Sequence, residues 1–263
     1  MGVSKIIVVA GTVGSGKTNW IYQQLSTNYD RYNSSNQKIL YFSPGTGTVP
    51  IDQKRLESDF PTIKVFQDGQ ESDFVKQLES ADFVYIELGF YLELNATAQL
   101  LANFPHQKVA VLPPNLQDSE WHSWADEIVK GMKIDTYQTQ AQIWRVPTIG
   151  QVIDEDSLQE FWYEITHHAY GEVIRAKGIF DVNDGRSIYA DYVMGIPSAS
   201  FLELDFPRYL EGRPKRFSGL EVVGTSLNQA ALAQTLSDCC LPDAMILQYQ
   251  QQVKQILAEG MTQ

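Results

Sequence analysis

The residues best suited to chemistry lie near the amino terminus, where residues 11–18 read Gly-Thr-Val-Gly-Ser-Gly-Lys-Thr. This stretch fits the spacing G-x-x-x-x-G-K-S/T in full. Glycines let the backbone turn so that successive N–H groups point at one anion, and a lysine and a hydroxyl suit outer phosphates and Mg²⁺. The alternative is a glycine-rich turn that binds nothing. The spacing predicts a loop around the phosphates of a nucleoside triphosphate, formed by Gly11, Gly14, Ser15, Gly16, Lys17 and Thr18.

Two carboxylates could complete such a site. Glu87 directly follows the apolar run at residues 83–86, where an acid that holds Mg²⁺ together with Thr18 is expected. Lys17 and Glu87 are therefore the predicted catalytic residues. Asp52 follows the loop at residues 44–50 and is predicted to act as a switch residue that senses the γ-phosphate. The plainer alternatives are an ordinary carboxylate at a strand end and a solvated loop aspartate.

The elements around these residues alternate between strands and helices. Ile-Ile-Val-Val at residues 6–9 is typical of a strand buried on both faces, and a helix is predicted at residues 17–25. Strand, loop and helix thus follow in the order that the phosphate loop requires. A further helix is predicted at residues 71–78, and strands at residues 39–42, 63–66, 83–86 and 109–112. This alternation favours an α/β domain with a mainly parallel sheet, assigned to residues 1–150.

The pattern changes after about residue 150. An acidic cluster at residues 154–157 precedes a helix predicted from Leu158 to about Tyr170. Asp184-Gly185 marks a hairpin, and strands are predicted at residues 173–180, 187–193, 199–204 and 220–224. Helices at residues 227–236 and 243–257 follow, the second with an apolar stripe of Ile246, Tyr249, Val253 and Ile256. Residues 151–263 are predicted to form a smaller α+β domain.

Composition limits the partners. Twenty Lys plus Arg against thirty-two Asp plus Glu give a net charge of -12, which argues against general binding to nucleic acid or an anionic membrane. No segment approaches the roughly 18 uninterrupted apolar residues of a membrane helix, and the first apolar run is too short for a secretory signal. The two cysteines, Cys239 and Cys240, are adjacent and cannot join distant segments. We expect a soluble, cytoplasmic protein.

Beyond the loop, four stretches resemble the CobW-like GTPases, the cobalamin-synthesis family that includes metallochaperones. Residues 43–52 are similar to that family's Asn-Glu-x-Gly-x-x-x-Ile-Asp segment, and residues 82–87 to the strand carrying its acidic Mg²⁺ residue. Residues 161–178, with Ala-Tyr-Gly and Arg-Ala-Lys-Gly, and residues 217–239 are similar to its C-terminal domain. The resemblance implies a P-loop NTPase fold that binds GTP (or ATP) and Mg²⁺. It also implies a protein partner, bound through a CobW C-terminal-like domain.

Three departures limit what this resemblance implies. The family's Gly-Cys-x-Cys-Cys metal motif corresponds to Gly-Gln-Glu-Ser-Asp at residues 69–73, so the thiol ligands are missing and no transition-metal site is predicted. The family's Asn-Lys-x-Asp segment, which recognises guanine, is matched only by Lys133-Ile134-Asp135, with Met132 in place of the asparagine. An amphipathic helix from Glu120 to Met132 explains that stretch equally well. Gly89 follows Glu87 one residue closer than in the family.

These features support two functions. The first is a nucleotide-dependent switch with weak GTP hydrolysis, and the second is a catalytically degenerate NTPase that serves as a scaffold or assembly factor for a protein partner. A small-molecule kinase shares the phosphate loop, but residues 19–145 offer only Arg31, Arg55 and Arg145 for an arginine-rich lid.

Three further groups have plain interpretations. His167 and His168 would point about 100° apart on a regular helix, so both rings do not easily bind one ion. A basic cluster around Tyr209 and Phe217 could hold an acidic partner, although a solvated turn is the plainer interpretation; it consists of Arg208, Arg213, Lys215 and Arg216. Trp121 and Trp124 share one helical face and are expected to pack against the core.

Overall fold

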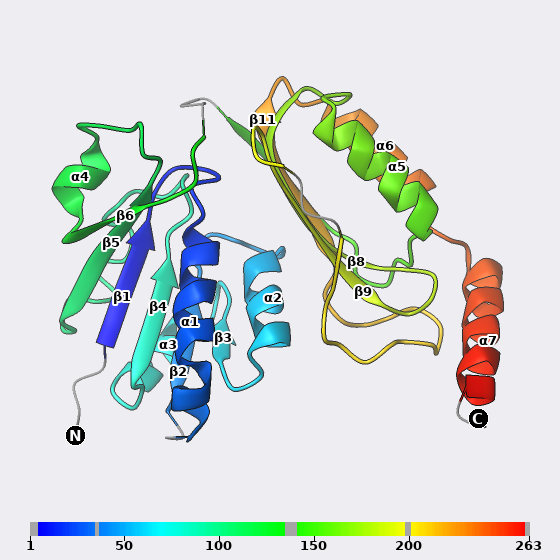
Figure 1. Ribbon diagram of the computed structural model, residues 1–263, viewed down its shortest axis with the longest axis horizontal. Helices are drawn as coiled ribbons and strands as arrows, with labels where there is room; N and C mark the ends of the chain where they lie inside the picture. The colour runs from blue at the N-terminus through cyan, green and yellow to red at the C-terminus, as the bar shows by residue number, and fades with distance from the viewer. Residues whose placement is uncertain (1–4, 35–36, 135–140, 198–200, 261–263) are drawn as a thin grey trace. The chain divides into compact units, whose positions relative to one another are not determined.

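The computed structural model describes residues 5–34, 37–134, 141–197 and 201–260. The chain divides into two compact units, one ending at Tyr137 and one beginning at Gln138, and each is described by itself (Figure 1). The second unit includes strand β7 (Gln142–Pro147), which pairs with β11 (Gly219–Thr225). This unit therefore begins earlier in the chain than the boundary expected at residue 150.

The first unit is built on a six-stranded sheet in the order β3-β2-β4-β1-β5-β6, in which all neighbouring strands are parallel. The strands are β1 (Lys5–Ala10), β2 (Ile39–Phe42), β3 (Lys64–Phe66), β4 (Phe83–Glu87), β5 (His106–Leu112) and β6 (Glu127–Lys130). The central strands are almost entirely buried, as expected for parallel strands covered by helices on both faces. The predicted α/β fold is confirmed.

Helices cover both faces of this sheet. α1 (Lys17–Ser34) and α2 (Ile51–Asp59) pack on one face, where Ile21 and Leu56 enter the core. α3 (Glu71–Leu78) and the short α4 (Glu120–Trp124) pack on the other, where Phe74 is buried and Trp121 and Trp124 lie against the core. The loops that follow β1, β2 and β4 all leave the sheet at the carboxyl ends of the parallel strands, and they meet there.

The amphipathic helix from Glu120 to Met132, one of two interpretations of that stretch, does not form as a whole. The stretch forms α4, which ends at Trp124, and then strand β6. Ile128 and Val129 of β6 pair with β5, and β-branched residues favour a pleated strand over a helix. Because β6 is an edge strand, Ile128 remains 44% exposed. The sequence therefore lacks the continuous buried run that identifies the central strands.

The second unit is built on a five-stranded antiparallel sheet in the order β10-β9-β8-β11-β7. β8 (Glu172–Asp181) and β9 (Ser187–Val193) form the hairpin that Asp184-Gly185 predicts, with Gly185 at a φ of +86°. β10 (Leu202–Glu203) is shorter than the strand expected at residues 199–204, of which residues 199 and 200 lie outside the described part of the chain.

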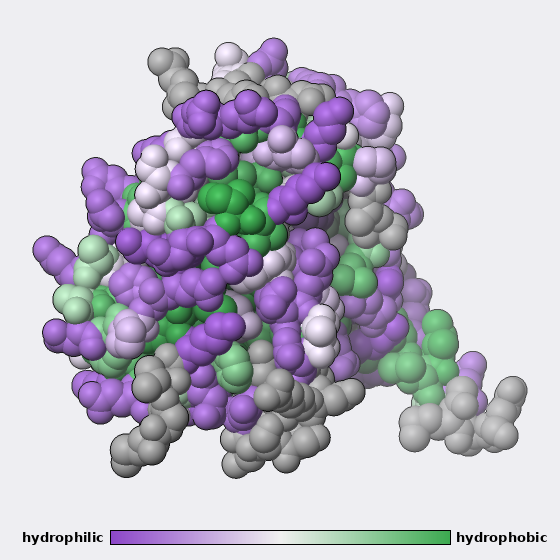
Figure 2. Space-filling view, turned by 60° about the vertical axis from the view of Figure 1, so that its left-hand side comes forward, coloured by the Kyte–Doolittle hydropathy of each residue, from purple (hydrophilic) through white to green (hydrophobic). Residues whose placement is uncertain are grey.

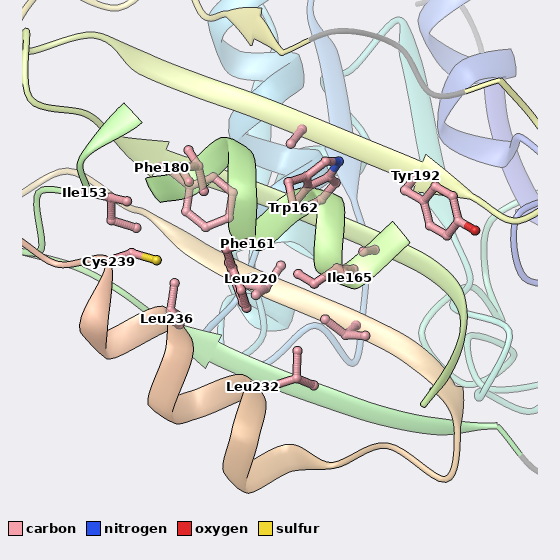
Figure 3. Packing of buried hydrophobic residues seen from close by; sticks show 14 of the residues in the cluster. Ile153, Phe161, Trp162, Ile165, Phe180, Tyr192, Leu220, Leu232, Leu236 and Cys239 are labelled. Carbon is pink, nitrogen blue, oxygen red and sulfur yellow. The ribbon is translucent and has the colours of Figure 1, made fainter. Parts of the chain in front are cut away.

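Two helices, α5 (Glu155–Thr166) and α6 (Gln229–Asp238), cover one face of the second sheet (Figure 3). Their apolar side chains point toward the strands and close a single core, which includes Phe161, Trp162, Phe180, Leu220, Leu232 and Leu236. The core explains why the chain after residue 150 alternates short apolar strands with amphipathic helices.

The ends of α5 follow local chemistry. Asp154 caps its start by accepting a hydrogen bond of 3.1 Å from the Ser157 N–H. The helix ends at Thr166 rather than near Tyr170, because His168 adopts a φ of +63° that a right-handed helix cannot include.

α7 (Asp243–Gly260) is only partly packed. Ile246 near its start is buried with Val152 and Leu241, whereas Ile256 is 67% exposed. The predicted apolar stripe of this helix is therefore buried at one end only. Figure 2 shows hydrophobic side chains at its lower right, where α7 ends. Among the described residues, no helix combines the length and the apolar character that crossing a bilayer requires.

Candidate functional site

The glycine-rich loop leaves β1 and leads directly into α1. Gly11, Gly14 and Gly16 have φ values of +147°, +70° and +92°, which residues with a side chain rarely adopt. A Cβ atom on Gly11 would lie 2.1 Å from the carbonyl oxygen of Val111 in β5. The path of the backbone therefore requires these glycines, as the sequence motif predicts.

Lys17 is the first residue of α1 and is 5% exposed. Its Nζ donates hydrogen bonds to the carbonyl oxygens of Gly11 (3.2 Å) and Thr12 (3.0 Å). The ammonium group thus folds back over the loop. The first N–H groups of a helix lack partners within the helix and, together with its dipole, attract an anion to this position.

Two hydroxyl groups of the loop are buried without a hydrogen-bond partner among the described residues, namely Thr12 Oγ1 and Ser15 Oγ. Thr12 is 8% exposed and Ser15 is 0% exposed. A buried polar group that stays unpaired costs on the order of 1–3 kcal/mol. Hydroxyls with spare hydrogen-bonding capacity, beside a lysine and a helix N-terminus, fit a phosphate group.

Glu87, the last residue of β4, lies beside the loop because β4 and β1 are neighbours, with Val9 opposite Glu87. Its Oε1 accepts a hydrogen bond of 2.9 Å from Thr18 Oγ1, and the residue is 6% exposed. A hydroxyl and a carboxylate are the hard oxygen ligands that Mg²⁺ prefers. The fold therefore brings Lys17, Thr18 and Glu87 into one site, and their donor atoms fit a bound Mg²⁺.

Tyr41 and Ser43 also belong to this site, although neither stands out in the sequence. The Tyr41 hydroxyl donates to Glu87 Oε2 at 2.9 Å, and Ser43 Oγ donates to the Glu87 carbonyl oxygen at 3.1 Å. Burial raises the pKa of Tyr41 well above its usual value, and the charges of Glu87 and Asp52 add to this. The one available signal was a tyrosine within a fully buried strand, because a buried phenol needs a partner.

Asp52 lies in the first turn of α2 rather than in a loop. Its negative charge contributes to the raised pKa of Tyr41, the tyrosine that contacts Glu87. The following residue, Gln53, is fully buried, and its Nε2 donates to the Ser43 carbonyl oxygen at 3.2 Å. The start of α2 is thus connected to the end of β2 at this site.

The turn in the loop between β2 and α2 is held in place by hydrogen bonds. Asp68 accepts hydrogen bonds from the N–H groups of Gly45 (2.8 Å) and Gly47 (2.6 Å). The Tyr91 hydroxyl donates to the Gly45 carbonyl oxygen at 2.9 Å. The segment that follows β2 is therefore linked to the segment that follows β4.

The chain after β6 packs against the phosphate loop. The Met132 N–H donates to the Ser15 carbonyl oxygen at 2.9 Å, and a Cβ atom on Gly131 would lie 2.4 Å from that same oxygen. Lys133 and Ile134 follow, whereas Asp135, the last residue of the expected base-reading fragment, lies outside the described residues. Met132, the residue before this fragment, therefore lies beside the phosphate loop.

The remaining candidates belong to the second unit. His167 stacks on Tyr163 with ring centroids 3.7 Å apart, and its Nδ1 lies 2.8 Å from the Tyr163 carbonyl oxygen. His168 sits beyond the end of α5. Cys239 and Cys240 are free thiols, and no three His, Cys, Asp or Glu residues of the described chain gather where they could hold a metal ion.

The arginines of the basic cluster are occupied within the second unit. Their partners are carboxylates: Arg208 pairs with Asp184 (3.2 Å), Arg213 with Asp243 (2.7 Å) and Arg216 with Asp181 (2.5 Å). These ion pairs hold the long connection between β10 and β11, which favours the structural interpretation of the cluster.

Comparisons with known proteins give distant structural similarity only. No protein-family model and no curated protein matches the sequence. The chain is similar to a zinc-bound triple mutant of the YjiA GTPase, at 12% identity over 91% of this chain and 99% of that chain, with a TM-score of 0.32. The zinc-bound YjiA GTPase from E. coli matches at 12% identity over the same 91% and 99%, with a TM-score of 0.31. FlhF in complex with GMPPNP and Mg²⁺ matches at 18% identity over 42% of this chain and 45% of that chain, with a TM-score of 0.30. At these values the fold assignment rests on the two sheets themselves.

Proposed function

We propose that the first unit binds a nucleoside triphosphate together with Mg²⁺, and that the chain works as a nucleotide-dependent switch with weak GTP hydrolysis. The observation that carries this proposal is the loop at residues 11–18. It combines glycines with positive φ, a buried lysine at the start of α1 and a threonine hydroxyl bonded to Glu87. A glycine-rich turn that binds nothing has no need for the lysine or for the hydroxyl–carboxylate pair.

Each part of the loop has one task in this proposal. Backbone N–H groups at residues 14–18 donate to phosphate oxygens, and the amino-terminal end of α1 supplies a favourable dipole. The Lys17 ammonium neutralises the outer phosphates once it exchanges the carbonyl oxygens of Gly11 and Thr12 for them. The loop thus binds triphosphate through charge and backbone geometry, without reading the base.

Thr18 and Glu87 are the residues that would hold Mg²⁺. When bound, the ion neutralises phosphate charge and orients the phosphates. Glu87 keeps its carboxylate beside the Thr18 hydroxyl, and its backbone carbonyl is fixed by Ser43. Residues 69–73, which resemble the position of a cysteine metal motif, contain no thiol, so a transition-metal cargo is not part of the proposal.

The switch would consist of Asp52 and the loop before it. That loop is held by Asp68 and Tyr91, and Tyr91 lies on the segment after Glu87. A change in the contacts of Glu87 on binding a γ-phosphate would therefore reach the loop by two routes, through β2 and through Tyr91. The second unit would carry the change to a protein partner.

Isothermal titration with GTP, ATP and their diphosphates in the presence of Mg²⁺ tests this proposal. GTP is preferred over ATP here by resemblance only, since Met132 stands where a guanine-reading asparagine would be. We expect the triphosphates to bind and the Lys17→Ala variant to lose binding. Wild-type protein that binds none of the four nucleotides would overturn the proposal.

The second candidate is a scaffold or assembly factor that has lost turnover. The observation in its favour is that Asp68 accepts hydrogen bonds from both Gly45 and Gly47. These bonds restrict the motion of the turn that a switch would need. Hydrolysis separates the two candidates. Release of phosphate from GTP above the rate of the Lys17→Ala variant excludes the pure scaffold, and equal rates exclude the hydrolytic switch.

A further inference from the structure

Tyr41 carries the one polar side-chain atom of β2, a strand whose four residues Ile-Leu-Tyr-Phe are all buried. The residue is 0% exposed and belongs to the apolar core beneath α1 and α2. A phenylalanine would fill nearly the same volume without the cost of burying a hydroxyl group. Packing alone therefore does not account for the tyrosine.

The hydroxyl has a specific partner. Tyr41 donates to Glu87 Oε2 at 2.9 Å, while Thr18 donates to Glu87 Oε1 at the same distance. Each oxygen of the carboxylate thus accepts a hydrogen bond from a hydroxyl group. The parallel pairing of β2 with β4 makes this possible, because it sets Tyr41 opposite Tyr85, two residues before Glu87.

We propose that Tyr41 is a positioning residue for the nucleotide site, which holds the Glu87 carboxylate so that Oε1 stays on the side of Thr18 and of the bound Mg²⁺. The inference rests on the proposed function and deepens it. A hydrogen bond to an ionised group is strong and fixes orientation. A ligand that is already held in its binding geometry loses less conformational freedom when the ion binds. Mg²⁺ dependence is then set in part by a residue that touches neither ion nor nucleotide.

The test is a Mg²⁺ titration of triphosphate binding to the full chain. The Mg²⁺ midpoint is the Mg²⁺ concentration at which the affinity for triphosphate has made half of its Mg²⁺-dependent increase. In Tyr41→Phe this midpoint should rise about tenfold, in line with the loss of one hydrogen bond to a charged group. Affinity measured in EDTA should stay within about twofold of wild type, because Lys17 and the loop amides are untouched. A merely structural tyrosine would lower the melting temperature and leave the Mg²⁺ midpoint in place.

Two further variants sharpen the result. Tyr22→Phe removes a phenol hydroxyl from the same unit, one that interacts with Asp59 and Ser26 rather than with Glu87, and should not move the Mg²⁺ midpoint. A double-mutant cycle with Glu87→Gln tests whether Tyr41 acts through Glu87. In the Glu87→Gln background, Tyr41→Phe should cause no further shift.

The outcomes separate this inference from the function on which it rests. Wild-type protein that binds no triphosphate overturns both. Wild-type protein whose binding depends on Mg²⁺, with an unchanged midpoint in Tyr41→Phe, overturns the role of Tyr41 alone. If Tyr41→Phe does not fold, the Tyr41→Phe/Glu87→Gln double variant provides the test instead. The neutral amide of Gln at position 87 has no negative charge that requires the Tyr41 hydroxyl as a hydrogen-bond donor. A midpoint equal to that of Glu87→Gln supports the role, and a further shift overturns it.

Discussion

Replacement of Gly11 by alanine is the sharpest perturbation of the phosphate loop. The new Cβ would lie 2.1 Å from the Val111 carbonyl oxygen, whereas such contacts essentially never fall below 3.0 Å. The loop or β5 would have to move by roughly 1 Å, and overpacking of this kind costs about 1–3 kcal/mol. The φ of +147° adds about 1–3 kcal/mol of backbone strain. Together these give about 2–6 kcal/mol, a large part of the stability of a typical domain.

Gly69→Ala is the matched control. Gly69 also has a positive φ, +86°, but nothing lies within 4 Å of its Cβ position, so its substitution should cost only about 1–2 kcal/mol of backbone strain. Unfolding in urea, monitored by hydrogen exchange of peptides from β1 and β5, measures the stability of the first unit separately from that of the second. Triphosphate binding by Gly11→Ala should also be lost. A Gly11→Ala variant as stable as Gly69→Ala, or one that binds nucleotide like wild type, would refute the reasoning.

Three further predictions follow from the fold. Asp68→Asn weakens the hydrogen bonds from the Gly45 and Gly47 N–H groups. Limited proteolysis at residues 43–50 should therefore become faster, and the cleavage rates with GTP and with GDP should differ less than in wild type. Unchanged cleavage would contradict the role of Asp68. Burial raises the pKa of Asp181 from 3.8 to about 6, although Arg216 acts to lower it. Because the folded state then holds the proton more tightly than the unfolded state, this group's contribution to stability falls as pH rises between those values and is constant above them. Asp181→Asn should remove that fall, so the unfolding free energy of the variant minus that of wild type should increase by about 3 kcal/mol over this window, and a constant difference would contradict the assignment. Titration with Zn²⁺ should show no stoichiometric tight uptake, since cysteine ligands are missing at residues 69–73; one tightly bound ion per chain would disprove this.

Much of the fold follows from local pattern. The buried strands of the first sheet are short β-branched or aromatic runs, and α3 spans the eight residues that its periodicity predicts. The Asp184-Gly185 hairpin is likewise specified by its turn residues. In these segments local preference and tertiary burial agree, which is why the sequence suffices.

Two edge strands and one helix end were not predictable in this way. β6 and β7 are edge strands, with side chains that are mostly half-buried or exposed, and neither shows a continuous apolar run. The end of α5 depends on the positive φ of His168, a backbone conformation that no periodicity reveals. The formation of β6 and β7 depends on pairing with distant segments, and the end of α5 on a single dihedral angle, so hydrophobic spacing reveals neither.

Only part of the candidate site could be predicted from the sequence. Lys17, Thr18 and Glu87 follow from a motif and from the position of an acid after a strand. Tyr41 and Ser43 do not, because their role depends on β2 lying next to β4. Strand order is a property of the whole sheet, so a partner provided by a neighbouring strand escapes any local pattern.

A crystal structure of the protein with a non-hydrolysable GTP analogue and Mg²⁺ tests the central claim most directly. The account predicts phosphates enclosed by residues 11–18, with Lys17 Nζ turned from the carbonyl oxygens of Gly11 and Thr12 to the outer phosphates, and the ion beside Thr18 and Glu87. Crystals that show the nucleotide bound elsewhere, or Lys17 still folded on its own loop with no phosphate beside it, would contradict the account.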